Sequence, residues 1–396
     1  MNGGFQAFRV FEENGHVTGR VVDATLEELG VGGIVIRASH SSVNYKDALA
    51  ATGTGKIIRR FPLIAGVDVA GTVISSDDSR FPPGKTVLVT GFDLGVAHNG
   101  GYAGVVRVPA DWVVAIPVGL TAFEAMAIGT AGFTAALSVV ELERNGLIPA
   151  AGPVIVTGAT GGVGSLAVQM LSARGYRVTA LTGKEEESDF LRSLGAADVL
   201  SRQSLQMGTR PLEKAVWAGA VDVVGGETLA WLTRTMMYNG AIASSGLTGG
   251  TDLNMTVMPF ILRGVKLLGI DSVMCPMTTR LEVWRRLASD LKPPQLERIA
   301  TTIGFDDLPH AFTTLLAGKA RGRDTSRAGN RRCPGWRRRS RTASARQDRS
   351  GVLPAIPLRS AESCRLPSAR TAVGSRRRDP RRRRQSPSSR RADCST

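Results

Sequence analysis

The sequence predicts an α/β protein in which a mostly β domain precedes a doubly wound parallel sheet. Short runs rich in Val and Ile, separated by Gly, Pro or Asp, fill residues 1–122 and are typical of antiparallel strands. From about residue 150, apolar strands alternate with helix-compatible stretches, as in βαβ units whose sheet is covered on both faces. Residues 324–396 are rich in Arg, Ser and Pro without apolar periodicity, so we expect a disordered C-terminal tail.

The elements follow in order along the chain. In residues 1–122, strands are expected in the runs GRVVDATL, GGIVIRAS, GTVISS, KTVLVTG and YAGVVRVP. The run LTAFEAMAIGTAGFTAALSVVELERNG then predicts one long helix with Gly146 as its C-cap. Next, PVIVTG predicts a strand, GVGSLAVQMLSARG a helix, YRVTALTG a strand and EEESDFLRSLGA a helix. After ADVLSR we expect a helix in KAVWAG, then VDVVGG, the helix TLAWLTRTMMYNG, the strand AIASSG and a helix around LEVWRRLASDL.

The formal net charge of +16 is concentrated at the end of the chain. Residues 320–396 contain 23 Arg, no Lys and 5 acidic residues, a net charge of +18, which leaves −2 for the rest. The globular part is therefore slightly acidic and gives no reason to expect nucleic acid on it. The segment RRRDPRRRR would bind phosphates without sequence specificity, so nucleic-acid binding by the tail stays open as an alternative of another class.

Four glycines within seven residues interrupt the apolar run VIVTGATGGVGSLAVQML at residues 154–171. They follow a predicted strand and open a predicted helix, the context in which such a pattern indicates dinucleotide binding. Without side chains, the backbone N–H groups can approach a pyrophosphate, and the first helical turn adds unpaired donors and the positive end of its dipole. The predicted cofactor contacts in this turn are Gly158, Ala159, Thr160, Gly161, Gly162, Val163 and Gly164.

The end of the next predicted strand indicates which dinucleotide binds. NAD-binding units usually carry an Asp or Glu there, on the ribose 2′-hydroxyl. In this chain the strand ends in Thr182, Gly183 and Lys184, with no acid at its tip. A 2′-phosphate would attract Lys184, and Arg202, after the third strand, would supply a second cation. The sequence therefore predicts NADPH rather than NADH.

Residues that bind metals are few and scattered. A catalytic zinc needs about three Cys, His or carboxylate ligands. Before the tail there is one cysteine, Cys275, and the four histidines show no ligand spacing: His16, His40, His98 and His310. We therefore expect no metal and no disulfide framework, which favours a reducing cytoplasm. No signal peptide is evident, and no apolar run approaches the roughly 18 residues of a membrane span, so no membrane is expected.

Five stretches of the chain resemble a known enzyme family. They are SSVNYKDALAATGTGKIIRRFPLIAGVDVAGTV (41–73), GTAGFTAAL (129–137), VTGATGGVGS (156–165), KAVWAGAVDVVGG (214–226) and TVMPFILRGVKLLGIDSV (256–273). Together, over about residues 5–323, they resemble the zinc-independent medium-chain dehydrogenases/reductases, and more closely their acrylyl-CoA reductase and quinone oxidoreductase branch. The resemblance implies a homodimer with a GroES-like catalytic domain (1–122), a Rossmann NADP-binding domain (123–260) and a return segment of the catalytic domain (261–323).

The resemblance also implies an activity: NADPH-dependent reduction of the carbon–carbon double bond of acrylyl-CoA or a similar enoyl thioester. Quinone reduction is the enzymatic alternative. Asn44 and Tyr45 resemble the family residues that face the nicotinamide, and Tyr45 is a candidate proton relay. Asp47 is expected to be structural, and Asp68 to be a buried partner that orients this loop. Further cofactor contacts are implied for Thr130, Thr134, Leu247, Ile261 and Ser272.

A basic cluster in GKIIRRFP lies close to these candidate residues along the chain. Lys56, Arg59 and Arg60 would suit a coenzyme A phosphate and are the candidate substrate-binding residues. A solvated loop explains the same charges equally well, and the sequence leaves both interpretations open.

The family match stops near the start of the tail. Members of the family end in a stretch of the form G-R-T-V/L-V, the last strand of the catalytic domain. Here Gly322 and Arg323 match, and DTSRAGNRR follows, so the closing strand is expected to be missing. A Lys-free, Arg-rich sequence is what a GC-rich gene gives when read out of frame, and we interpret residues 324–396 as such an extension.

Overall fold

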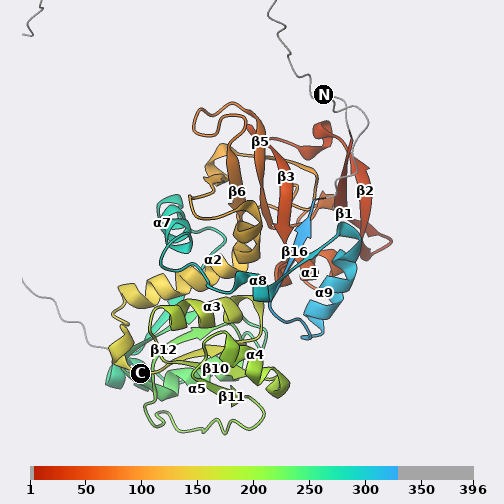
Figure 1. The fold of residues 1–396 in the computed structure, drawn as a ribbon. Helices are drawn as coiled ribbons and strands as arrows, with labels where there is room; N and C mark the ends of the chain where they lie inside the picture. The colour runs from red at the N-terminus through yellow and green to blue at the C-terminus, as the bar shows by residue number, and fades with distance from the viewer. Residues whose placement is uncertain (1–3, 329–396) are drawn as a thin grey trace, which may run out of the picture. The chain divides into compact units, whose positions relative to one another are not determined.

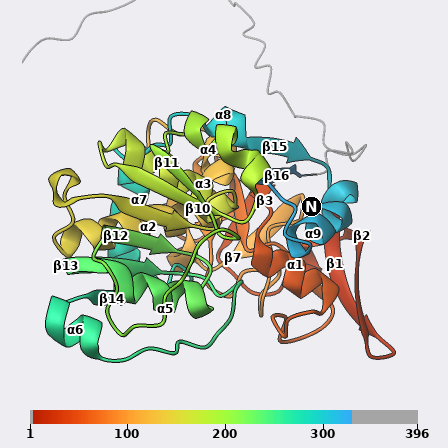
Figure 2. The same ribbon diagram turned by 90° about the horizontal axis from the view of Figure 1, so that it is seen from below.

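The computed structural model describes residues 4–328, which form three β-sheets and the helices packed on them (Figures 1 and 2). From residue 329 onward the tail, with the predictions of disorder, out-of-frame sequence and nucleic-acid binding, lies outside the described residues. Short 3₁₀ helices connect the longer elements at Leu26–Leu29, Ala110–Trp112, Pro149–Ala151, Glu185–Glu187 and Phe305–Asp307.

The first domain is built on a seven-stranded sheet of order β15-β16-β3-β5-β6-β8, with β7 also paired to β3. Its early strands pair antiparallel, as predicted: β3 Ile34–Ser42, β5 Asp68–Ser76, β6 Thr86–Thr90, β7 Val105–Val108 and β8 Val114–Ala115. A three-stranded sheet of order β2-β1-β4 adds β1 Phe5–Glu13, β2 His16–Ala24 and β4 Leu63–Ile64. The remaining elements of this domain are α1 Tyr45–Thr52, α8 Leu296–Ile299, β15 Ala300–Ile303, α9 Leu308–Leu316 and β16 Arg323–Arg327.

The second domain contains a fully parallel six-stranded sheet of order β11-β10-β9-β12-β13-β14. Its strands are β9 Val154–Thr157, β10 Val178–Thr182, β11 Asp198–Ser201, β12 Trp217–Asp222, β13 Met236–Ser244 and β14 Lys266–Gly269. The helices are α3 Gly162–Ala173, α4 Ser188–Ser193, α5 Gly226–Thr235, α6 Met258–Arg263 and, toward the first domain, α7 Met277–Leu287. Because the strand order reverses between β9 and β12, the predicted Rossmann arrangement is confirmed, with its switch point at the glycine-rich turn.

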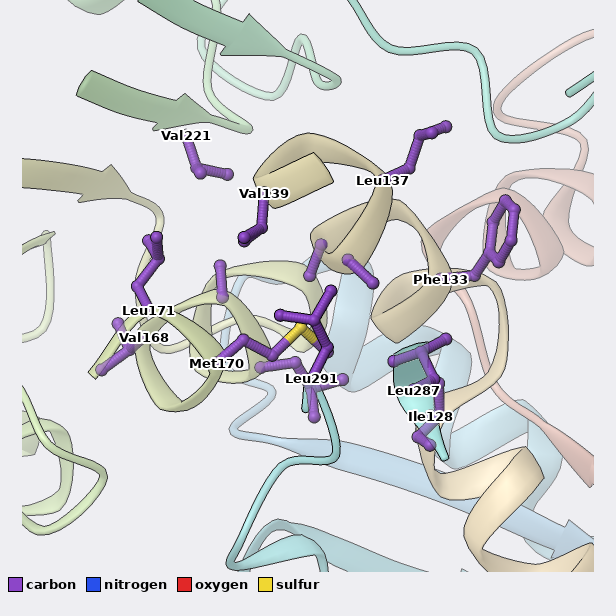
Figure 3. Close-up of a cluster of buried hydrophobic side chains, with 14 of the residues drawn as sticks. Ile128, Phe133, Leu137, Val139, Val168, Met170, Leu171, Val221, Leu287 and Leu291 are labelled. Atoms are coloured by element: carbon purple, nitrogen blue, oxygen red, sulfur yellow. The ribbon is translucent and has the colours of Figure 1, made fainter. Parts of the chain in front are cut away.

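Helix α2, Ala122–Arg144, joins the two domains. One part packs on β3, β5 and β6 of the first sheet, and the other packs on α3, α7 and β13. Figure 3 shows this second part, where Val139 of α2 lies near Val221 of β12 and Met170 of α3 lies beside Leu291. The helix bends at Gly129, whose φ of 51° and ψ of −159° no helical residue adopts. The kink lets one helix follow both domains.

Helix α2 is long and apolar enough to cross a membrane by length and composition, contrary to the expectation that no run approaches this limit. Of its most apolar window, 89% is buried inside the protein, so its apolar side chains are accounted for by core packing.

Two expectations for local structure are wrong. No helix forms in KAVWAG; the run belongs to the approach to and start of β12, whose six residues are all buried. The helix expected through residues 228–240 ends at Thr235, and β13 begins at Met236. The strand β14 lies in the six-stranded sheet, so the parallel sheet extends past the expected domain boundary at residue 260.

The closing strand of the first domain is present, against expectation. Strand β16, Arg323–Arg327, pairs parallel with β15 and antiparallel with β3 through Thr325, Ser326 and Arg327 (Figure 1). Backbone hydrogen bonds form a ladder whatever the side chains are, so RDTSR pairs although it lacks the apolar alternation of the family's strand. The polar sequence has a cost, because the buried hydroxyl of Ser326 has no hydrogen-bond partner.

Candidate active site

A cavity of about 360 Å³, here called the cleft, opens between the two domains. The parallel sheet contributes Gly162, Ser245 and Ile270, which follow the carboxyl ends of β9, β13 and β14. Ligands of open α/β sheets bind at this edge. The first domain contributes the segment around Asn44, the end of β6, the kinked part of α2 and β16.

The glycine turn, residues 158–164, fits a diphosphate because side chains have no room in it. Gly158 has a φ of 56°, and a Cβ there would lie 2.6 Å from a methyl group of Val223. A Cβ on Gly164 would lie 2.4 Å from the carbonyl oxygen of Gly158. Helix α3 starts at Gly162 with Gly161 as its N-cap, so its first N–H groups and its dipole point to the cleft side of the turn.

Asp222, at the end of β12, fixes the position of the glycine turn through hydrogen bonds. Its carboxylate accepts hydrogen bonds from the Thr157 hydroxyl at 2.7 Å and from the Gly225 N–H at 2.9 Å. The same Thr157 hydroxyl accepts a bond from the N–H of Val223 at 3.0 Å. Complete burial raises the pKa of Asp222, and the bonds it accepts act in the opposite direction. The sequence analysis missed this residue, although its place one strand from the turn is a signal.

The two cations predicted for a 2′-phosphate lie at the end of β10. A Cβ on Gly183 would lie 3.0 Å from a guanidinium nitrogen of Arg202, so this side chain covers the strand tip. The Arg202 N–H donates to the carbonyl oxygen of Thr182 at 2.7 Å, but its guanidinium makes no ion pair or hydrogen bond within residues 4–328, so its charge is available to an anion. Lys184 donates to the carbonyl oxygen of Ala320 at 2.6 Å, and partial burial lowers its pKa.

Asp68 connects the candidate catalytic loop to α2. It is completely buried and accepts hydrogen bonds from the Ser42 hydroxyl, from Asn44 Nδ2 at 2.9 Å, and from the Thr130 N–H and hydroxyl at 2.8 and 2.5 Å. The Thr130 N–H is free to donate because the kink at Gly129 interrupts the helical ladder. The structure thus places Asp68 in the orienting position predicted for it.

Asp47 holds the start of α1. One carboxylate oxygen accepts the N–H of Asn44 at 2.9 Å and its Nδ2 at 3.2 Å, and the other accepts the Val67 N–H at 3.0 Å. Burial, and then the nearby charge of Asp68, raise the pKa of Asp47 to about 7. The adjacent Tyr45 lines the cleft with 41% of its surface exposed, and its hydroxyl makes no hydrogen bond within the described residues.

The raised pKa of Asp47 predicts a pH-dependent stability. The native carboxyl keeps a proton that the unfolded chain loses above its ordinary pKa of 3.8. Between about pH 4 and pH 7 this group therefore lowers the free energy of unfolding as pH rises, by up to about 1.4 kcal/mol per pH unit. We expect Asp47→Asn to flatten the slope in urea unfolding measured across this window. Exposed Asp23→Asn is the control, and an unchanged slope in Asp47→Asn would contradict the assignment.

The structure brings some implied cofactor residues together and leaves others apart. Thr130, Thr134 and Ser272 line the cleft, and the Thr134 hydroxyl lies 2.8 Å from that of Ser272. Leu247 and Ile261 do not line it; they are 61% and 73% exposed, and Ile261 lies on α6. Because these two residues lie outside the cleft lining, the structure gives no support to the cofactor contacts implied for them.

The basic cluster lies beside the cleft, outside its lining. Lys56, Arg59 and Arg60 are exposed. The Arg59 N–H donates to the carbonyl oxygen of Val96. The Arg59 guanidinium lies 3.5 Å from the carboxylate of Asp93, which directly follows the cleft residue Phe92.

Two cations of the cleft were missed by sequence reasoning. Lys46 lines it next to Tyr45, and its side chain has no hydrogen bond or ion pair within residues 4–328. Arg323 lines it from β16 and donates to the carbonyl oxygen of Val43 at 3.0 Å and to Asn44 Oδ1 at 3.2 Å. Its Nη2 is buried without a partner, and burial lowers its pKa. The Gly-Arg match at residues 322–323 was the available signal.

In the described part of the chain, no three His, Cys, Asp or Glu side chains come together as a metal site. Cys275, the one cysteine there, is buried, and burial raises its pKa.

Two family models match the chain: the alcohol dehydrogenase GroES-like domain over residues 30–118 and the zinc-binding dehydrogenase domain over residues 162–289. The putative quinone oxidoreductase YhfP of Bacillus subtilis is 50% identical over 321 residues, which cover 81% of this chain and 97% of that protein. The acrylyl-CoA reductase AcuI of Ruegeria pomeroyi is 47% identical over 313 residues, which cover 79% of this chain and 95% of that protein. The chain belongs to the zinc-independent branch of the medium-chain dehydrogenase/reductase family.

Solved structures of this family have the same fold. The YhdH oxidoreductase of Salmonella enterica, crystallised with NADP, is 47% identical with a TM-score of 0.80, covering 82% of this chain and 100% of that chain. Bacillus subtilis YhfP, crystallised with NAD, is 49% identical with a TM-score of 0.80, covering 82% of this chain and 99% of that chain. The present medium-chain reductase is thus an oxidoreductase with the predicted GroES-like and Rossmann domains.

Proposed function

We propose that this chain catalyses the NADPH-dependent reduction of the carbon–carbon double bond of acrylyl-CoA or a similar short enoyl thioester. The observation that carries the proposal is the single cleft that joins the glycine turn at Gly162 to Asn44 and Tyr45 of the catalytic domain. The likeness to AcuI over nearly that protein's whole length supports the same substrate.

The residues present fit NADPH. The glycine turn has no room for side chains, Arg323 has a buried unpartnered donor at the cleft, and Arg202 offers a free charge at Gly183. The glycine turn would hold the diphosphate, Lys184 and Arg202 the 2′-phosphate, and Thr130, Thr134 and Ser272 the nicotinamide side. When bound, NADPH supplies the hydride that is added to the β-carbon of the enoyl group.

The chain's own residues would bind and orient the substrate and supply a proton. Asp68 and Asp47 fix Asn44 from two sides, so its position in the cleft is set before ligands bind. The hydroxyl of Tyr45 has no protein partner in the described residues and can hydrogen-bond the thioester carbonyl or pass a proton to the α-carbon. Lys46 adds a positive charge where the carbonyl oxygen gains negative charge.

NADPH oxidation with acrylyl-CoA, set beside oxidation with a small quinone, tests the proposal. We expect kcat/KM to be at least about tenfold higher for acrylyl-CoA. The 50% identity to YhfP supports quinone reduction as the second candidate, and a higher kcat/KM for the quinone would favour it. The two substrates share the cofactor, so a protein active on neither would contradict both candidates.

Arg202 is expected to select the phosphorylated cofactor. Replacing Arg202 by Ala removes one of two cations proposed for the 2′-phosphate and should weaken NADPH binding about tenfold. NADH binding should change little, because NADH has no such phosphate. Quenching of intrinsic fluorescence by each nucleotide measures both affinities, and an equal loss for both would refute the role.

Arg59 and Arg60 are proposed to bind a coenzyme A phosphate at the rim of the cleft. Replacing both by Ala should raise KM for acrylyl-CoA by about three- to tenfold, because exposed charge contacts are modest in energy. KM for a small quinone should stay constant, since a quinone has no phosphate. Equal changes for the two substrates would show that the cluster is only a solvated loop.

A homodimer is proposed through the edge of the parallel sheet. Strand β14 has a single neighbour among the described strands, and the adjacent segment exposes Val257, Ile261 and Leu262 by 62%, 73% and 51%. An apolar surface beside an unpaired strand edge is typical of an interface. Sedimentation tests the proposal: the wild type should sediment as a dimer, and Ile261→Lys should sediment as a monomer.

A cytoplasmic location stays a prediction.

A further inference from the structure

Five side chains stack on one another from the first domain into α7. Trp112 and Phe92 are parallel within 2° with ring centres 5.4 Å apart. Arg280 Cζ lies 4.4 Å from the Phe92 ring centre and 4.9 Å from that of Phe133. Phe133, on α2, in turn stacks on Trp284 at 6.0 Å. This set, here called the Arg280 stack, connects both domains behind the cleft.

Arg280 is the central member and is completely buried. One guanidinium nitrogen donates to the carbonyl oxygen and hydroxyl of Thr90, at 2.8 and 3.0 Å. The other donates to the carbonyl oxygens of Ser272 and Val273, at 3.1 and 3.0 Å. No carboxylate pairs with Arg280 within residues 4–328, so carbonyl dipoles and two aromatic faces take the place of a counter-ion. Arg280 thereby ties the end of β6 to the loop after β14.

Both tied segments form walls of the cleft. Phe92, two residues after Thr90, lines it, as do the adjacent Ser272 and Val273. The Phe92 N–H donates to the carbonyl oxygen of Val273 at 3.1 Å. Phe92 has a φ of 53°, a left-handed conformation that bulky residues rarely adopt. Strained residues of this kind persist where the surrounding structure determines them, and they concentrate at ligand sites.

We propose that Arg280 holds Phe92 as a fixed wall of the cleft, and that this wall limits the enoyl group to short chains. The proposal rests on the proposed function and names the specificity determinant of the same site. The cleft volume of about 360 Å³ is near the lower end for ligand cavities, roughly 300–1,000 Å³, and it must also admit the nicotinamide. Phe92 lines the cleft and packs on Arg280, so we expect removal of its ring to leave space beside the cleft that a longer acyl chain can enter.

The variant Phe92→Gly tests the wall without forcing the backbone. Glycine accepts the positive φ, so the fold should persist while the ring is lost. We expect the ratio of kcat/KM for trans-2-hexenoyl-CoA to that for acrylyl-CoA to rise at least about tenfold, the effect of a few methylene groups in a pocket. A lost contact that was only structural would lower both values and leave their ratio unchanged, and this result would overturn the proposal.

The variant Arg280→Met tests the holding residue, and Arg285→Met is its matched control on an exposed position of the same helix. Arg280→Met should shift the ratio in the same direction as Phe92→Gly, and Arg285→Met should leave it unchanged. If Arg280→Met does not fold, the ratio in Phe92→Gly decides. If the wild type reduces only quinones, the proposed function fails. In that case the wall is tested by the ratio of kcat/KM for menadione to kcat/KM for benzoquinone. This ratio should rise in Phe92→Gly.

Discussion

Replacing Asp68 by Ala is expected to lower the free energy of unfolding by about 3 kcal/mol or more and to abolish most activity. The change leaves the Ser42 hydroxyl, Asn44 Nδ2 and both donors of Thr130 without their acceptor in a fully buried site. Each unsatisfied buried donor costs about 1–3 kcal/mol, although part of this is recovered by relaxation. Activity should fall because Asn44 and the kinked part of α2 both line the cleft.

Urea unfolding and steady-state kinetics measure the two effects. Asp68→Asn keeps one acceptor oxygen and should recover part of the stability, while Asp23→Ala, an exposed carboxylate on β2, should change neither quantity. A further readout separates charge from packing. Because the charge of Asp68 raises the pKa of Asp47, either substitution at residue 68 should lower that pKa. A loss below about 1 kcal/mol in Asp68→Ala would contradict the role assigned to it.

The second large effect is expected in the glycine turn, where three substitutions separate folding from cofactor binding. In Gly164→Ala the new Cβ would lie 2.4 Å from the Gly158 carbonyl oxygen and 2.7 Å from Ala159 Cα, both backbone atoms that cannot move aside. We expect it to destabilise the protein by about 1–3 kcal/mol and to remove NADPH binding. In Gly161→Ala the closest atom is 3.3 Å away and φ is −77°, so the fold should tolerate the methyl group.

Gly161→Ala should nevertheless weaken NADPH binding about tenfold or more, because the methyl group occupies space proposed for the diphosphate. Gly269→Ala, at the end of β14 with no atom within 4 Å, is the control and should change neither property. Melting temperatures with and without NADPH report both quantities in one experiment. Equal affinity for NADPH in Gly161→Ala and the wild type would place the diphosphate elsewhere.

Local patterns predicted much of the fold, and they failed where burial in a sheet outweighs them. The glycine turn and the alternation of strands and helices are local signals, and the parallel sheet follows from them. KAVWAG has the composition of a short helix, yet Trp217 and its successors pair between two strands in the centre of a sheet. Strand β16 escaped notice for a related reason: its pairing depends on backbone bonds, and RDTSR lacks the alternation that marks a strand.

The candidate site was predictable where its residues belong to recognisable motifs. Asn44, Tyr45 and Thr130 come from stretches that resemble the family, and they line the cleft. Arg280 had no such signal, because its partner Thr90 is 190 residues away in the sequence. Burial of a charge against carbonyl groups is a property of the folded chain, and no local sequence pattern indicates it. The acidic anchor Asp222 lies in the family-like stretch 214–226, but its bond to Thr157 joins strands 65 residues apart in the sequence and is visible only in the folded chain.

The position of β16 sets the order in which the chain can mature on the ribosome. Its partner β3 emerges from the ribosome first. Residues 34–37 of β3 pair with β7, whereas residues 40–42 pair with β16 on the same side and must wait for it. Nearly three hundred residues of translation separate these two strands, including every strand of the six-stranded sheet. The inserted nucleotide-binding unit, whose contacts are close in sequence, can therefore complete its sheet during synthesis. The catalytic sheet that surrounds it in sequence is finished last.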